Sequence, residues 1–154
     1  MDISDLIAPE GVMVPLKVTS KKQALQAMAR RAAEMTGLNE RVVFDVLLER
    51  ERLGTTGVGN GIAIPHGRLA SVSSMHGVFA RLARPINFDA IDDQPVDLIF
   101  LLLAPESAGA DHLKALARVS RLLRDRGMCE KLRGAETPEA LYGLLISGRA
   151  SQAA

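Results

Sequence analysis

The residues best suited to chemistry lie in one short segment, residues 54–67, which reads GTTGVGNGIAIPHG. Near its end, His66 stands between Pro65, which has a fixed φ and no N–H donor, and Gly67, which leaves space beside the imidazole. A histidine has an ordinary pKa of about 6.5, so much of it is neutral and nucleophilic near neutral pH. His66 is therefore a candidate nucleophile, although a histidine that only satisfies its structural surroundings is the alternative.

Glycines crowd the residues before His66, and they stand at Gly54, Gly57, Gly59 and Gly61. Such a segment can bring backbone N–H groups close to an anion, or it can be a tight connection that binds nothing. The familiar nucleotide motifs do not fit. Asn60 and Gly61 stand where a Walker A loop needs Lys and Ser or Thr, and isoleucines (Ile62, Ile64) stand where GxGxxG needs its last glycine.

Two further residues have side chains suited to a phosphoryl group. His112 falls in the first turn of an amphipathic helix, and a helix N-terminus favours anions, although His112 could simply cap its own helix at the rim of the core. Arg50 directly precedes the glycine segment, and a guanidinium binds phosphate through two parallel hydrogen bonds. The alternative for Arg50 is a favourable interaction with the C-terminus of its own helix.

A metal site is not indicated. The third histidine, His76, lies inside a predicted strand, where a structural or exposed role is the simpler interpretation. The sequence has neither HExxH nor CxxC, and its one cysteine is Cys129. We therefore expect no metal and no cofactor.

Strands and helices alternate along the chain, which predicts the α/β class: a single domain with a mixed β-sheet covered by helices on both faces. The apolar run 98–104 is typical of a central strand. The predicted strands are residues 12–18 (an edge strand because of Pro15), 62–64, 75–82 and 96–103, with a short one at 86–88. The first two predicted helices follow their caps: one runs from Ser20 up to Gly37, and the other from Asn39 to about Leu53. A third should span 110–126, with Gly127 as terminator and Leu113 on its apolar side. A short helix at 129–132 and a last one from Thr137 to about Ile146 complete the prediction.

Composition limits the function. The 154 residues carry 19 Lys+Arg against 18 Asp+Glu, and the aromatic residues are four Phe and one Tyr. Neither a basic field nor a base-stacking surface is present, so we expect no nucleic-acid partner, and the longest apolar run is too short for membrane insertion. A single cysteine suggests a reducing, cytoplasmic location. One domain should fill residues 1–154, with a core of about 5–147 and a frayed tail at 148–154.

Two stretches together resemble a known family. RERLGTTGVGNGIAIPHG at 50–67 closely resembles the phosphoacceptor motif of the mannitol/fructose-class enzyme IIA domains of the phosphoenolpyruvate-dependent phosphotransferase system. LLLAPE at 101–106 and HLKALA at 112–117 are similar to the second signature of that family. SKKQAL at 20–25 and GIAIPHGR at 61–68 are similar to its nitrogen-regulatory branch.

The resemblance implies that His66 accepts a phosphoryl group from an HPr-like carrier, with His112 and Arg50 close by. The second ring nitrogen of His66 should be held by a hydrogen bond that sets its tautomer. Glu106 could lie near the site or be a solvated loop acid. The expected phosphate-loop supports are Thr55, Thr56 and Asn60 through their side chains and Gly57, Gly59 and Gly61 through their backbone.

The same resemblance implies that the phosphorylation state of the protein regulates partners such as sensor kinases or potassium transporters. Two alternatives stay open. A sugar-specific IIA of the fructose or mannitol type would pass its phosphoryl group to a IIB domain. A regulatory binding module would keep the fold without ever being phosphorylated at His66.

Overall fold

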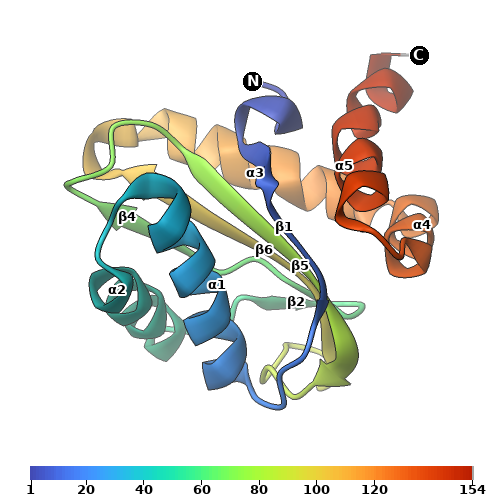
Figure 1. The fold of residues 1–154 in the computed structure, drawn as a ribbon, viewed down its shortest axis with the longest axis horizontal. Coiled ribbons are helices and arrows are strands. Elements are labelled where there is room, and N and C mark those ends of the chain that lie inside the picture. The colour runs from blue at the N-terminus through green and yellow to red at the C-terminus, as the bar shows by residue number, and fades with distance from the viewer. Residues whose placement is uncertain (154) are drawn as a thin grey trace.

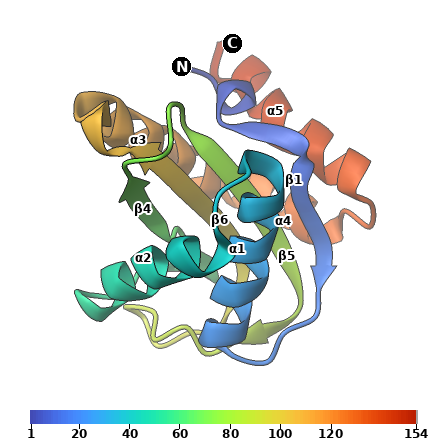
Figure 2. The ribbon, with the colours of Figure 1, turned by 60° about the vertical axis from the view of Figure 1, so that its left-hand side comes forward.

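A mixed six-stranded β-sheet lies between two groups of helices in the computed structural model, which describes the backbone of residues 1–153 and the side chains of residues 1–147. Helices α1 and α2 cover one face of the sheet, and α3, α4 and α5 lie on the other side (Figure 1, Figure 2). The predicted architecture, an α/β domain with helices on both faces, is therefore confirmed.

Most elements follow the predicted order, but two short strands, β2 at 57–59 and β4 at 66–69, were not predicted, and several ends differ. The strands are β1 (Ile7–Leu16), β2 (Gly57–Gly59), β3 (Ile62–Ala63), β4 (His66–Leu69), β5 (His76–Ile86) and β6 (Val96–Pro105). The α-helices are α1 (Lys21–Thr36), α2 (Glu40–Arg52), α3 (Ala110–Arg124), α4 (Arg126–Gly134) and α5 (Pro138–Ala153). Two short 3-10 helices, Ile3–Asp5 and Glu106–Ala108, complete the order.

Strand β6 organises the sheet. It pairs antiparallel with β5, which in turn pairs parallel with β1, the edge strand that carries Pro15. Along its other side, β6 pairs parallel first with β3, where Ile62 lies opposite Leu98, and then with β4, where His66 lies opposite Leu102. Strand β2 pairs antiparallel with β3 and completes the hairpin at that end. The glycine-rich segment thus runs alongside β6, beside its first half at β3 and beside its second half at β4.

Successive residues of β6 point to opposite faces, and each face has its own core. The side chains of Ile99, Leu101 and Leu103 pack with α1 and α2. The alternate residues Leu98, Phe100 and Leu102 pack with α3, α4 and α5. All six are fully buried, which explains the uninterrupted apolar run, because a strand covered on both faces needs apolar residues at every position.

The predicted helix caps are present at three helices. The Ser20 hydroxyl accepts from the N–H of Gln23 at 3.2 Å at the start of α1, which ends at Gly37 in the left-handed region. At α2, the Asn39 side chain accepts from two backbone N–H groups, and at α5 the Thr137 hydroxyl accepts from the N–H of Ala140. These local signals are readable from sequence because each needs only the residues of one turn.

Several predicted boundaries need correction. Strand β1 begins at Ile7, earlier than expected, and Ile86 ends β5, so residues 86–88 form no separate strand. Leu113 is 65% exposed and does not pack in the core. Helix α5 runs to Ala153, beyond the expected end near Ile146. The side chains of the predicted frayed tail, residues 148–154, lie outside the described residues.

The expected terminator Gly127 lies inside a helix. Helix α3 ends earlier, at Arg124, and Asp125 separates it from α4. The Asp125 carboxylate accepts from the N–H of Met128 at 3.1 Å and caps α4. A capping side chain at Asp125 therefore replaces the glycine stop that the sequence suggests.

This correction leads to a stability prediction. Because Gly127 is helical, Gly127→Ala should raise the free energy of unfolding by about 0.5 kcal/mol. The matched control is Gly37→Ala, where φ is +76°, and that substitution should lower the free energy of unfolding by about 1 kcal/mol. Urea denaturation of both variants measures the two effects. A destabilising Gly127→Ala would return residue 127 to the role of helix terminator.

Candidate functional site

Close packing between α2 and β4 brings the first two site residues together. A Cβ added to Gly67 would lie 2.5 Å from Cγ1 of Val46 on α2, so only glycine lets the helix approach the strand this closely. His66 is the first residue of β4, and Arg50 lies in the last turn of α2. The sequence joins them only through the connecting hairpin, whereas the fold joins them directly.

The hydrogen bonds of His66 define which nitrogen is reactive. Its Nδ1 lies 2.9 Å from the carbonyl oxygen of Ile64. A carbonyl oxygen only accepts, so the proton of the ring is on Nδ1. The other nitrogen, Nε2, accepts from Nε of Arg50 at 3.3 Å. His66 is thus a neutral imidazole whose Nε2 carries a lone pair, and the expected tautomer-setting bond is the one to Ile64.

The buried carboxylate of Glu51 fixes the backbone segment that orients the ring of His66. Glu51 is 8% exposed, lies 2.8 Å from the ammonium of Lys21, and accepts hydrogen bonds from both the hydroxyl and the N–H of Thr56. The carbonyl oxygen of Thr56 accepts from the N–H of Ile64 at 3.0 Å. The Glu51 carboxylate therefore fixes Thr56, Thr56 fixes Ile64, and the Ile64 carbonyl fixes the ring of His66.

Arg50 interacts both with the site and with the end of its own helix. Its Nε donates to His66, and its Nη1 donates to the carbonyl oxygen of Gly54 at 2.9 Å, just past the end of α2. The two alternatives that the sequence left open for Arg50 are therefore compatible. The second hydrogen bond orients the guanidinium at the ring nitrogen.

His112 completes a pair of imidazoles. It lies in the first turn of α3, is 4% exposed, and places its ring centroid 5.5 Å from that of His66 at an interplanar angle of 71°. Its Nδ1 accepts from Nε of Arg68 at 2.9 Å, so its own proton is on Nε2. That buried Nε2 has no hydrogen-bond partner within the described part of the chain.

Burial and charge keep both imidazoles neutral. Burial lowers the pKa of His66 below its ordinary value of 6.5, and the positive charges of Arg50 and Arg68 act in the same direction. The hydrogen bond to the Ile64 carbonyl and the charge of Glu51 oppose this effect. Burial also lowers the pKa of His112, and the neighbouring ring of His66 and the positive charge of Arg68 act in the same direction.

A cavity of about 410 Å³ opens over the two histidines. Arg50, Arg68 and both imidazoles line this cavity, and the exposed side chains of Leu53 and Leu113 form its apolar rim. These two leucines are 82% and 65% exposed, and they come from helices on opposite faces of the sheet. The two imidazoles and the two arginines therefore lie among apolar side chains, and such a surface suits contact with another protein that delivers the reacting group.

The sequence did not single out two residues that matter here, Arg68 and Glu51. Arg68 is two residues beyond His66 on β4, so the period of a strand places it on the same face, and the PHGR string carries that signal. Glu51 follows Leu47 by four residues and Phe44 by seven, so the helical period already places it on the buried face of α2. Its partners Lys21 and Thr56 have no such signal, because they come from α1 and from the segment before the hairpin.

The glycine-rich segment does not wrap around His66. It forms the β2–β3 hairpin, whose turn carries Asn60 at a φ of +57°. The carbonyl oxygen of Gly61 accepts from the N–H of Leu98, whereas His66 lies opposite Leu102. At ~3.3 Å per residue along β6, these two points are separated by roughly 13 Å. The turn of this hairpin therefore lies apart from His66, near the other end of β6.

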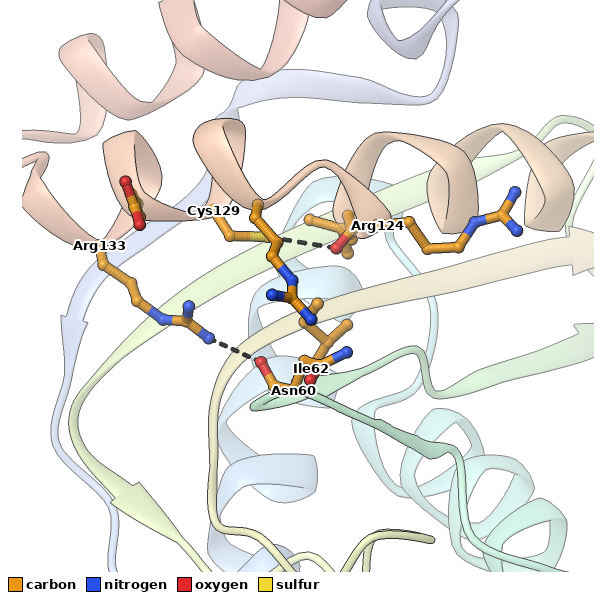
Figure 3. Close-up of a pocket in the computed structure, with 8 residues that line it drawn as sticks. Asn60, Ile62, Arg124, Cys129 and Arg133 are labelled. Atoms are coloured by element: carbon orange, nitrogen blue, oxygen red, sulfur yellow. Dashed lines mark hydrogen bonds between the residues drawn. The ribbon is translucent and has the colours of Figure 1, made fainter.

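The predicted loop supports have other partners in this hairpin. The Thr55 hydroxyl donates to the carbonyl oxygen of Phe88 at 3.1 Å. The carbonyl oxygen of Asn60 accepts from Nη2 of Arg133 at 2.9 Å, at a separate cavity of about 240 Å³ beside α4 (Figure 3). Of the three polar residues expected around the phosphate, the structure links only Thr56 to His66. The three glycines, Gly57, Gly59 and Gly61, also lie in or beside the hairpin strands.

Other expected features lie apart from the pocket. His76 begins β5 with its Nε2 at 3.3 Å from the Ser74 hydroxyl, and Glu106 is exposed in a 3-10 helix that does not line the cavity.

Across the described residues, no three His, Cys, Asp or Glu side chains gather closely enough to hold a metal ion. None of the helices within residues 1–153 combines the length and apolar character needed to span a bilayer.

Comparison with known proteins identifies the family of this chain. Residues 5–148 match the family described as "Phosphoenolpyruvate-dependent sugar phosphotransferase system, EIIA 2". A nitrogen regulatory protein of Bradyrhizobium diazoefficiens is 62% identical over 145 residues, which cover 94% of this chain and 95% of that protein. A fructose-specific EIIA component of the phosphotransferase system of Haloferax volcanii is 38% identical over 145 residues, 94% of each chain.

A solved structure supports the same assignment. The crystal structure of the nitrogen regulatory protein IIA-Ntr from Neisseria meningitidis superposes with a TM-score of 0.88 at 35% identity, covering 93% of this chain and 98% of that chain. The resemblance inferred from residues 50–67 and 101–117 thus extends over nearly the whole fold. The chain belongs to the EIIA 2 family of the phosphoenolpyruvate-dependent sugar phosphotransferase system.

Proposed function

We propose that this protein is a phosphoryl carrier of the nitrogen-regulatory type, which accepts a phosphoryl group on Nε2 of His66 from an HPr-like carrier. The observation that carries the proposal is the hydrogen bond from Nδ1 of His66 to the Ile64 carbonyl, which leaves Nε2 as a nucleophile in the pocket. Burial lowers the pKa of His66 and keeps that lone pair available at neutral pH.

The transfer step needs no external base. The lone pair on Nε2 of His66 attacks the phosphorus of the donor's phosphohistidine, and a new N–P bond forms there. The N–P bond of the donor breaks, and its electron pair returns to the donor's ring nitrogen. The ring of His66 gains positive charge during the step, and the Ile64 carbonyl stabilises this charge through the Nδ1 proton.

Charge on the moving phosphoryl group requires donors around Nε2. Arg50 already points its Nε at that nitrogen and is positioned to move onto a phosphoryl oxygen. His112 contributes a buried Nε2–H that lacks a partner in the described structure and that a second phosphoryl oxygen could accept from. Catalysis then consists of positioning and charge stabilisation, as is general for phosphoryl transfer.

Regulation follows from the change in charge at the pocket. A phosphoryl group adds about −1.5 to −2 charges at neutral pH, directly between the exposed Leu53 and Leu113. A partner that binds this apolar rim would meet a different electrostatic surface in each state. We assign sensor kinases or potassium transporters as the class of regulated partner, supported by the higher identity to a nitrogen regulatory protein than to a fructose-specific component.

Phosphorylation of His66 is the primary test. Incubation with phosphoenolpyruvate, the first enzyme of the nitrogen branch and its HPr-like carrier should add the mass of one phosphoryl group, measured by intact-protein mass spectrometry at neutral to alkaline pH. His66→Ala should abolish the gain, while the matched control His76→Ala should retain it. Full labelling of His66→Ala would show that another residue is the acceptor.

The same assay separates the alternatives. Faster labelling by the carrier of the sugar branch, followed by transfer to a fructose-type IIB domain, would identify a sugar-specific IIA. If neither branch labels the protein while a known IIA is labelled in parallel, the protein is a binding module that keeps the fold without the chemistry.

Arg50 should be needed for the transfer rate. Arg50→Ala should slow single-turnover phosphorylation about 10²- to 10³-fold, because it removes a donor aimed at the developing charge. Arg52→Ala is the matched control, since Arg52 is an exposed arginine in the same last turn of α2. Rapid-quench measurements give both rates. Equal rates for the two variants would mean that Arg50 only stabilises the end of its helix.

The pKa of His66 sets the expected pH dependence. Because the folded protein lowers this pKa below 6.5, Nε2 stays unprotonated until the pH falls below the ordinary histidine range. The NMR titration of His66 should therefore have its midpoint below 6.5, and the phosphorylation rate should fall in the same lower pH window. A midpoint at or above that of a histidine in an unstructured peptide would contradict the buried, neutral site.

A further inference from the structure

We infer that Arg68 is a positioning residue, which fixes His112 as a neutral Nε2–H donor for the phosphoryl group on His66. The inference rests on the proposed function, since it concerns how that group is received. It starts from the hydrogen bond that the Arg68 side chain makes in the described structure, from its Nε to Nδ1 of His112 at 2.9 Å.

The strand geometry directs Arg68 to His112. Gly67 and Leu69 are buried on the α2 side of β4, where Leu69 joins the core under α1 and α2. Because side chains alternate along a strand, His66 and Arg68 point to the other side. There α3 presents His112, so the arginine bridges the strand and the helix that carry the two imidazoles.

The bond selects one form of His112. A guanidinium N–H can only donate, so Nδ1 must keep its lone pair. This excludes both the doubly protonated ring and the tautomer with its proton on Nδ1. The remaining form has its proton on Nε2, the buried atom that no described group satisfies. In that form His112 can donate to an anion at His66, and it cannot compete with His66 as a nucleophile through Nε2.

Two other roles for Arg68 make different predictions. If its guanidinium binds the phosphoryl group directly, its removal should slow transfer whether or not His112 is present. If it only ties β4 to α3, its removal should lower stability without changing the proton position on His112. A role through His112 requires that the effect on transfer disappear once His112 is gone.

The tautomer of His112 provides the first test. Long-range ¹H–¹⁵N NMR spectra of the unphosphorylated protein should show the proton of His112 on Nε2. In Arg68→Met the proton should be shared between the two nitrogens of His112. The pKa of His112 should also rise, because a neighbouring positive charge is lost. The other titratable or charged groups that line the cavity, His66, Arg50 and Glu49, are unchanged in this variant. Arg68→Lys, which keeps a donor and a charge, should restore the Nε2–H form.

The control is Arg84→Met, which removes an exposed arginine from β5 that does not line the cavity. It should leave the spectrum of His112 unchanged. An unchanged tautomer and pKa of His112 in Arg68→Met would overturn the inference, whatever the effect of that substitution on activity.

Transfer kinetics provide the second test. Arg68→Met should slow phosphorylation of His66 by about tenfold, the worth of one well-aligned hydrogen bond, and Arg68→Lys should recover most of the rate. In a His112→Ala background, Arg68→Met should cause no further slowing, and a further tenfold loss there would overturn the inference in favour of direct contact. If the unsubstituted protein takes no phosphoryl group at all, the proposed function fails, and the NMR result still decides whether Arg68 sets the form of His112.

Discussion

The hydrogen bond between Nδ1 of His66 and the Ile64 carbonyl is the contact on which the site depends. It places the ring proton on Nδ1 and leaves the lone pair on Nε2, the atom proposed to attack the phosphorus. The position of the Ile64 carbonyl is fixed by a backbone hydrogen bond from Ile64 to Thr56. Thr56 is fixed in turn by its hydrogen bonds to the buried carboxylate of Glu51. Glu51 is itself paired with Lys21 at the start of α1, whose ammonium lies 4.8 Å from the ring centroid of Phe88. The orientation of one imidazole is thus tied to three elements of the fold.

The two histidines have the same side chain and opposite hydrogen-bonding roles. His66 donates from Nδ1 to a carbonyl oxygen, which makes its Nε2 an acceptor and a nucleophile. His112 accepts at Nδ1 from a guanidinium, which makes its Nε2 a donor. Burial lowers the pKa of both rings, so neither role is lost to protonation at neutral pH. The chemical difference between them comes entirely from the partner of Nδ1, and each partner is supplied from β4 or from the residues just before it.

How far the sequence predicts this arrangement depends on the range of each interaction. The helix caps and the fully apolar β6 are local patterns and were predicted, whereas strand β4, which begins at His66, was not. The sequence left the hairpin open because the same glycines suit an anion-binding loop and a tight β-turn, and only pairing with β6 shows that the segment forms a hairpin. The ion pair of Glu51 with Lys21 and the bond from Arg68 to His112 depend on elements that meet in three dimensions, so composition and spacing could not predict these partners. The predicted helix end at Gly127 was wrong for a related reason, since Asp125 already ends α3 and caps α4.

The position of the site in the fold suggests how phosphorylation can act as a signal. The two cores, one on each face of the sheet, share no side chain, and the pocket lies beside β4 where helices from both faces come together. Leu53, just after α2, and Leu113 of α3 form the rim, so a partner that covers His66 must contact the helices of both layers. A phosphoryl group added there changes the charge of that surface without entering either core. The two states should therefore differ in what they bind, while the stability and shape of the domain stay nearly the same.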